Sequence, residues 1–158
     1  MIETRIAQEC PDQPDVIRLL VASDDYHAAL YPQASNHLVD VSGLLGKDVR
    51  FLVARTPDGV AVGCGAILLD EEQGIPVAEL KRMWVAPRIR GGGLGRCLLK
   101  ALEAAAQREG AAVLRLETGI RQPEARALYS AAGYRECEPF GSYSADPLSV
   151  FMEKACGA

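Results

Sequence analysis

The spacing of hydrophobic residues changes along the chain. Apolar residues recur at helical spacing over residues 15–22 and again over 38–45. The polar and aromatic segment 23–36 between them is expected to finish the first helix and then to loop over a site. From residue 49 the pattern becomes that of strands separated by glycine- and proline-containing turns. The strands expected in this part of the chain are 2–7, 50–55, 60–69 and 77–85.

The second half contains the clearest helix. Residues 94–109 carry one apolar stripe, and Gly110 is expected to end the helix. A helix that starts at Gln122-Pro123 and is capped by Gly133 should follow a buried strand over 112–117. Two further strands are expected over 134–138 and 149–154, joined by an aromatic loop. Together these elements predict one α+β domain spanning residues 1–158.

Composition narrows the class of protein. A chain of 158 residues with 49% hydrophobic residues and a net charge of -4 is typical of a globular protein and argues against binding to nucleic acid or a membrane surface. The five cysteines lack paired spacing, and no apolar signal region or membrane-spanning run is seen, so we expect a cytoplasmic protein. His27 and His37 lack the spacing of metal ligands, so no metal is expected.

Residues 79–96 combine a strand, a basic glycine-rich turn and the start of a helix. Glycines let backbone amides approach a ligand, and a helix N-terminus adds positive potential, so the segment predicts an anion site. Arg88, Arg90 and Arg96 would add positive charge. The dinucleotide fingerprint fails because Arg96 replaces its third glycine, and Gly46-Lys47-Asp48 fails the phosphate-loop pattern. A phosphate-bearing cofactor held mainly by backbone is expected.

Two motifs carry a family resemblance. One is the turn Arg90-Gly91-Gly92-Gly93-Leu94-Gly95, and the other is Gln122-x-x-Ala125-x-x-Leu128-Tyr129-x-x-x-Gly133-Tyr134. Together they resemble the GCN5-related N-acetyltransferase (GNAT) superfamily, whose second signature usually begins with Asn and ends in Gly-Phe. The order of elements matches along essentially the whole chain, and short stretches resemble a bacterial small-molecule-type subgroup. The resemblance implies a mixed, mostly antiparallel central sheet of six to seven strands flanked by about four helices.

The resemblance also implies acetyl-CoA as cofactor, with CoA as product. The glycine turn would hold the pyrophosphate through its amides, and the end of the preceding strand would hold the pantetheine arm through its main chain. The implied cofactor-binding residues are Met83, Trp84, Val85, Arg90, Gly91, Gly92, Gly93, Leu94, Gly95, Arg96, Gln122, Ala125 and Leu128.

Three residues are candidates for catalysis. Tyr129 matches the family's tyrosine near the cofactor sulfur and would act as the acid for the departing thiolate, or it only packs within its apolar stripe. Glu79 is a candidate base, or else a surface partner of Lys81 or Arg82. Glu117 is the rival base, or else it binds the substrate ammonium. The family implies direct attack in a ternary complex, without an acyl-enzyme.

The acceptor is less closely defined. Tyr26, Tyr31, Phe140 and Tyr143 are expected to form an aromatic acceptor pocket, or else to anchor loops. The leading hypothesis is an N-acetyltransferase that acts on a primary amine of a small molecule or amino acid. The alternatives are a protein acetyltransferase for an N-terminus or lysine, and a non-catalytic acyl-CoA-binding sensor. Neither nucleic acid nor membrane is expected as a partner, and a homodimer is left open.

Overall fold

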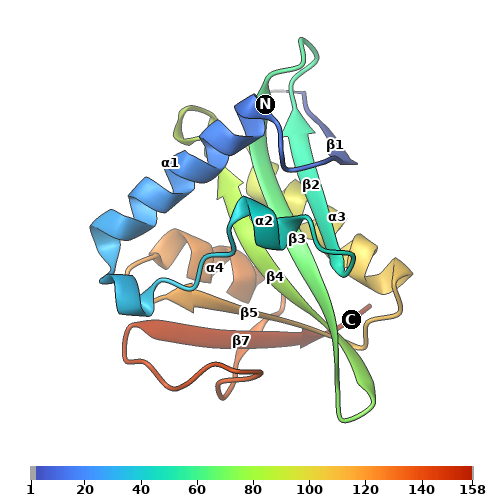
Figure 1. The fold of residues 1–158 in the computed structure, drawn as a ribbon, viewed down its shortest axis with the longest axis vertical. Coiled ribbons are helices and arrows are strands. Elements are labelled where there is room, and N and C mark those ends of the chain that lie inside the picture. The colour runs from blue at the N-terminus through green and yellow to red at the C-terminus, as the bar shows by residue number, and fades with distance from the viewer. Residues whose placement is uncertain (1–2, 158) are drawn as a thin grey trace.

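A twisted sheet of seven strands forms the centre of the protein, seen in a computed structural model that describes residues 3–157 (Figure 1). The spatial order is β1-β2-β3-β4-β5-β7-β6, and the pair β4–β5 is parallel while the other neighbouring pairs are antiparallel. This confirms the expected mixed, mostly antiparallel sheet. The strands are β1 (Arg5–Gln8), β2 (Val49–Arg55), β3 (Ala61–Glu72), β4 (Ile75–Val85), β5 (Val113–Gly119), β6 (Arg135–Glu136) and β7 (Ser149–Ala155).

Helices cover both faces of the sheet. In Figure 1, α1 and α2 lie in front of it, and α3 and α4 lie behind. Each face has its own core because side chains alternate along a strand: Leu20 and Leu44 pack with Phe51 and Val53 on one face, whereas Leu102 packs with residues such as Leu80 and Leu114 on the other. The helices are α1 (Pro14–Leu30), α2 (Val41–Leu44), α3 (Leu94–Arg108) and α4 (Pro123–Ala131), with 3₁₀ turns at Gln33–Ser35 and Pro87–Ile89.

The first helix extends well beyond its apolar stripe over 15–22. It ends at Leu30, within the segment 23–36 that was expected to finish it, because exposed Asp24 and Asp25 are tolerated on the outer face of the helix and nothing breaks it before Pro32. A residue before proline disfavours the helical conformation, and Tyr31 is accordingly extended, with φ −132° and ψ 147°. The extra turns carry His27 and the chain up to Tyr31 towards the middle of the sheet.

Other boundaries also differ from expectation: the strands expected over 60–69, 77–85 and 112–117 are observed at Ala61–Glu72, Ile75–Val85 and Val113–Gly119. The second helix, predicted over 38–45, is limited to Val41–Leu44, and the Asp40 side chain caps it by accepting a hydrogen bond from the Gly43 amide at 2.8 Å. The strand predicted over 134–138 pairs only at Arg135–Glu136. The strand predicted over 2–7 is observed at Arg5–Gln8, and Ile2 lies outside the described residues.

The parallel strands β4 and β5 separate partway along their length. They pair over Val77–Leu80 and Val113–Leu116, after which both continue without pairing to each other. A bulge follows at once in β4, where Arg82 has φ +58° and the register to β3 shifts between Cys64 and Ala66. A wedge therefore opens between the carboxyl ends of β4 and β5, and it faces the start of α4.

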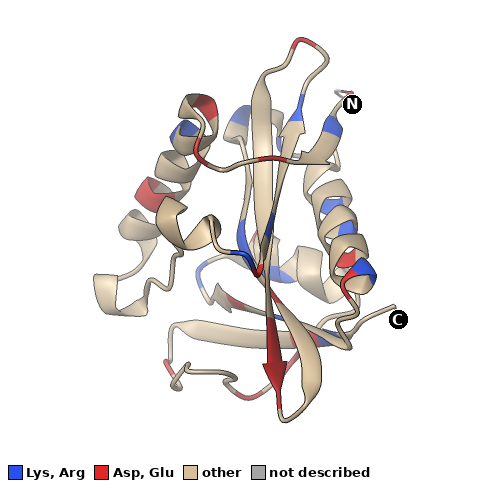
Figure 2. Ribbon diagram, turned by 45° about the vertical axis from the view of Figure 1, so that its right-hand side comes forward, with Lys and Arg blue, Asp and Glu red and all other residues tan. Residues whose placement is uncertain are grey.

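Charged residues are interspersed along the helices and strands, as Figure 2 shows. Among residues 3–157, no helix combines the length and the apolar character needed to cross a membrane.

Candidate active site

A cleft of about 460 Å³ lies between the end of β4, with the glycine turn that follows it, and α4. This volume is within the range of small-molecule sites, about 300–1,000 Å³. Every predicted cofactor-binding residue except Gly92 lines the cleft, so segments 83–96 and 122–128 face each other across it. The residues in question are Met83, Trp84, Val85, Arg90, Gly91, Gly93, Leu94, Gly95, Arg96, Gln122, Ala125 and Leu128.

The glycine turn forms one end of this cleft. Gly91 and Gly93 have φ of +88° and +87°, a conformation that side chains disfavour, and Gly93 caps α3 without any side-chain hydrogen bond. The first helical bond runs from the Cys97 amide to the Gly93 carbonyl at 3.1 Å, so the preceding amides of the first turn have no partner within the helix. Such amides, at the positive end of the helix dipole, suit a phosphate group.

Arg90 is held against the protein. Its guanidinium lies 4.5 Å from the centre of the Trp84 ring, and its Nε donates a hydrogen bond to the Val85 carbonyl at 2.9 Å. The Tyr26 ring packs against the Trp84 ring, with the two centroids 5.3 Å apart. The stack gives one wall of the cleft an aromatic and cationic surface.

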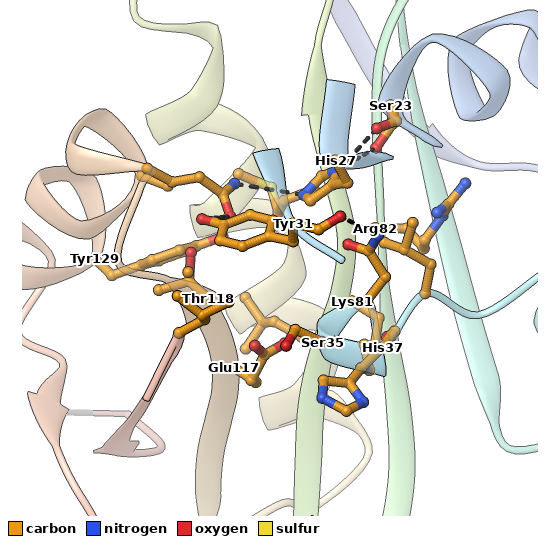
Figure 3. Close-up of a pocket in the computed structure, with 18 residues that line it drawn as sticks. Ser23, His27, Tyr31, Ser35, His37, Lys81, Arg82, Glu117, Thr118 and Tyr129 are labelled. Atoms are coloured by element: carbon orange, nitrogen blue, oxygen red, sulfur yellow. Dashed lines mark hydrogen bonds between the residues drawn. The ribbon is translucent and has the colours of Figure 1, made fainter. Parts of the chain in front are cut away.

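A smaller polar cavity of about 90 Å³ adjoins the cleft (Figure 3). Its walls come from the end of α1, residues 35–38, the middle of β4, the end of β5 and the start of α4. The two cavities share five lining residues: His27, Met83, Gln122, Ala125 and Tyr129. A ligand in the cleft and a second ligand in the small cavity would therefore meet beside Tyr129.

Tyr129 is almost fully enclosed, with 7% of its surface exposed. Burial raises its pKa to about 12, so the hydroxyl stays protonated at neutral pH. Its ring contacts that of Tyr134 edge-on, with centroids 5.8 Å apart. Tyr129 thus both packs in the core and presents a proton donor where the cavities join.

The two candidate carboxylates have different surroundings. Glu117, at the end of β5, lines the small cavity, and burial raises its pKa. Glu79 lines neither cavity, because Tyr143 donates a hydrogen bond to its Oε2 at 2.6 Å and the Lys81 Nζ lies 3.4 Å from the same atom. Of the two, Glu117 is the one in position to meet a ligand in the small cavity.

The four aromatic residues expected around the acceptor do not share one pocket. Tyr31 lines the small cavity, and Tyr26 lines the cleft. Phe140 and Tyr143 instead pack on Phe151 of β7, at centroid distances of 5.6 and 5.3 Å. The loop that carries Phe140 and Tyr143 therefore packs over β7. The small cavity, which these two rings do not line, is mainly polar.

A chain of hydrogen bonds that the sequence analysis missed joins α1 to α4. Tyr31 donates to Gln122 Oε1 at 3.1 Å, Gln122 Nε2 lies 3.4 Å from His27 Nε2, and His27 Nδ1 lies 2.7 Å from the Ser23 carbonyl. The Nδ1 hydrogen faces that carbonyl, so Nε2 is the acceptor. The i, i+4 spacing of Ser23, His27 and Tyr31 was the available signal, but the sequence pattern did not establish where within 23–36 the helix ends.

His27 sits in this chain as a neutral ring. Its pKa is lowered, first by burial and then by the nearby Arg82 charge, against the opposing effect of its bond to Ser23. Within residues 3–157, no group of three or more His, Cys, Asp or Glu side chains is arranged to hold a metal ion.

Gly119 allows the Tyr31 ring to reach the end of β5. A Cβ at this position would lie 1.8 Å from the Tyr31 hydroxyl oxygen, and the Arg121 amide donates to that oxygen at 3.1 Å. The contact between the end of α1 and the β5–α4 turn therefore requires glycine here.

Comparisons with known proteins agree with this architecture. Residues 47–136 match the family described as Acetyltransferase (GNAT) domain. The chain is 48% identical over 154 residues to an IAA acetyltransferase of Azospirillum brasilense, an alignment that covers 98% of this chain and 99% of the relative.

Solved structures extend the comparison. A structure from Klebsiella pneumoniae subsp. pneumoniae, assigned to the acyl-CoA N-acyltransferases, superposes with a TM-score of 0.84 at 42% identity and covers 97% of each chain. The PaiA N-acetyltransferase of Thermoplasma acidophilum, solved in complex with coenzyme A, shares the fold at 19% identity with a TM-score of 0.75, over 98% of this chain and 99% of that one. The chain belongs to the GNAT family and is an acetyltransferase of that family.

Proposed function

We propose that this acetyltransferase binds acetyl-CoA in the cleft and transfers the acetyl group to a primary amine of a small molecule in the adjoining polar cavity. The observation that carries the proposal is the junction of the two cavities at Tyr129. A donor and an acceptor bound side by side would react directly, in a ternary complex.

The cleft suits acetyl-CoA in shape and charge. The unpartnered amides at the start of α3 and the Arg96 charge would hold the pyrophosphate, and the end of β4 would run beside the pantetheine arm. The relative from Thermoplasma acidophilum, which shares the fold, has been solved with coenzyme A, and this supports the choice of cofactor. Bound there, acetyl-CoA supplies the thioester carbonyl that the amine attacks.

Glu117 is proposed as the base of the reaction, and Tyr129 as the hydrogen-bond donor to the leaving sulfur. Glu117 would take a proton from the substrate ammonium, and its raised pKa makes it a stronger base than an exposed carboxylate. The neutral nitrogen then forms the new C–N bond, the C–S bond breaks with its electron pair leaving on sulfur, and the proton that the nitrogen loses on becoming an amide passes to the thiolate to give CoA thiol. Tyr129 would donate a hydrogen bond to that sulfur. With its pKa near 12, against about 8.5 for a thiol, it stays a donor rather than an acid that ionises.

The size of the acceptor cavity supports a small substrate. At about 90 Å³, and walled on one side by residues 35–38, it is too small for a peptide chain, and the open hollow of about 480 Å³ that shares His37 and Lys81 with it does not extend to Tyr129. This favours a small amine over a protein N-terminus or lysine.

The test is release of CoA thiol from acetyl-CoA in the presence of amines, amino acids and peptides. We expect thiol release with small amines and none above background with peptides. Trp84, the single tryptophan, lines the cleft, so its fluorescence reports cofactor binding separately. Binding of acetyl-CoA without turnover of any amine would contradict the proposal.

A further inference from the structure

The charges around the small cavity are paired, with one exception. Lys81 has three ammonium hydrogens, and three oxygens surround its Nζ: the His37 carbonyl at 2.7 Å, Glu79 Oε2 at 3.4 Å and the Tyr143 hydroxyl. The Tyr143 ring also packs beneath the ammonium, with its centroid 5.0 Å from Nζ. Lys81 therefore has no free donor for a ligand.

Arg82, the other cation in the cavity wall, is also engaged. Its side chain is 2% exposed, its Nη1 contacts Asp24 at 2.6 Å and its Nη2 donates to the Leu20 carbonyl at 3.1 Å, so the guanidinium is directed to α1. Its Nε finds no acceptor in the described part of the chain, but the atom is buried out of reach of solvent. A carboxylate in the cavity could not pair with this arginine without breaking the contacts to α1.

Two histidines also line the small cavity. His27 Nδ1 is bound to the Ser23 carbonyl, and burial keeps the ring neutral. The His37 ring packs edge-on against Tyr143, at a centroid distance of 5.2 Å, and its charge acts on Glu117.

Glu117 is the one charged side chain of the cavity wall without a direct ion-pair partner in the described part of the chain. Within residues 3–157 it takes part in no ion pair, although the cavity largely encloses it. The nearby charges of Lys81 and His37 act on Glu117 without pairing with it directly, and burial, the largest influence, still raises its pKa. A buried carboxylate without a directly paired counter-charge is costly, and a bound cation would relieve that cost. A second carboxylate brought in by a ligand would meet Glu117, and neither Lys81 nor Arg82 would be free to pair with it.

We infer, on the basis of the proposed function, that the natural acceptor is a small amine that carries one positive charge and no carboxylate. Its ammonium pairs with Glu117, and its remaining polar groups meet the hydroxyl and amide side chains of the cavity. Free amino acids, which carry a carboxylate beside the amine, are poor acceptors.

The experiment compares acceptors that differ only in the carboxylate. Ethanolamine, serine and serine methyl ester form one matched set, and ethylamine, alanine and alanine methyl ester form a second, with kcat/KM measured by thiol release. We expect kcat/KM at least about tenfold higher for the amine than for the amino acid, with the methyl ester recovering most of the loss. Recovery by the ester separates the effect of charge from that of size.

Two variants test the assignment of charges. Glu117→Gln should lower kcat/KM for the amines and shrink the difference between amine and amino acid, while the Trp84 fluorescence still reports normal cofactor binding. Glu79→Gln releases Lys81 from its carboxylate partner and should therefore raise the activity towards serine relative to ethanolamine. A purely structural role of Glu79 would not change this ratio.

The outcomes are distinguishable. If amino acids are acetylated as well as or better than their amines, the inference is overturned and acetyl transfer to small molecules stands. If acetyl-CoA binds and neither set releases thiol, the proposed function fails and this inference fails with it.

Discussion

Burial has different consequences for the two side chains proposed to react. It keeps Tyr129 protonated, because the phenolate would be poorly solvated, and it makes Glu117 more basic for the same reason. One residue is thereby suited to donate a hydrogen bond to sulfur, and the other to accept a proton from nitrogen. The sequence patterns named both residues, but only their depth in the fold shows how their protonation is biased.

Replacement of Tyr129 by phenylalanine removes the proposed hydrogen bond to the leaving sulfur. We expect kcat to fall by about 10- to 1,000-fold with little change in the Kd of acetyl-CoA, because the lost contact matters mainly as charge develops on sulfur. Steady-state thiol release and Trp84 fluorescence measure the two quantities. Tyr134→Phe is the matched control: this neighbouring hydroxyl donates to Glu103 at 2.8 Å, away from the cavities, so kcat should be retained. An unchanged kcat in Tyr129→Phe would exclude the proposed role.

Glu117 should lower the stability of the folded protein at neutral pH. A carboxyl whose folded pKa is raised favours the folded state while protonated, and this contribution is lost as the pH rises through the folded pKa. Glu117→Gln stays neutral, so we expect its Tm to exceed that of the wild type at pH 7 and the difference to shrink towards pH 4. Thermal unfolding followed by circular dichroism at several pH values measures it. A difference independent of pH would contradict this explanation.

At the scale of elements, the glycine turn depends on backbone conformation at Gly93. Valine there would be strained at φ +87° and would shift the amides at the start of α3, although its Cβ would meet no atom within 4 Å. We expect Gly93→Val to weaken acetyl-CoA binding by at least about tenfold, as measured by Trp84 fluorescence. Gly92→Ala is the control, because its φ is not positive and its Cβ would make an ordinary 3.7 Å contact with the Ile89 carbonyl oxygen. Normal binding by Gly93→Val would argue against the phosphate site.

The contact between α1 and the β5–α4 turn should depend on Gly119. Alanine there would collide with the Tyr31 ring, and such overpacking typically lowers stability by about 1–3 kcal/mol. Gly119→Ala should therefore lower the free energy of unfolding by this amount in denaturant melts. In the double variant Tyr31→Ala/Gly119→Ala the clash cannot occur, so its loss of unfolding free energy should be smaller than the sum of the losses in the two single variants. Simple addition of the two losses would show that Tyr31 and Gly119 do not interact.

For the whole molecule, both cores share one sheet, so we expect a single cooperative unfolding transition. The front core contains Trp84, and the back core contains α3 and α4. Tryptophan fluorescence and far-ultraviolet circular dichroism should therefore give the same midpoint in urea. Two separate midpoints would contradict the proposal that residues 1–158 form one domain.

The cleft proposed to hold acetyl-CoA is lined by residues that the sequence predicted, through local patterns and the family resemblance together. Most of its residues lie in two short segments, 83–96 and 122–128, and local rules set the conformation of each: a strand that ends, glycines that allow positive φ, and a helix that starts at a proline. Within such a segment, spacing decides which residues share a face. The glycine turn and the inward face of α4 were therefore recognisable before any fold was known.

The acceptor side was decided by the tertiary structure. Its walls come from at least five separate parts of the chain, and no local rule sets the distance between the end of α1 and the end of β5. The pairings Lys81 with Glu79 and Arg82 with Asp24 depend on that packing, as does the isolation of Glu117. Charges in a sequence become partners or remain alone only when long-range contacts bring them together. For this reason the sequence indicated acetyl transfer, whereas the charge of the acceptor could be inferred only from the folded protein.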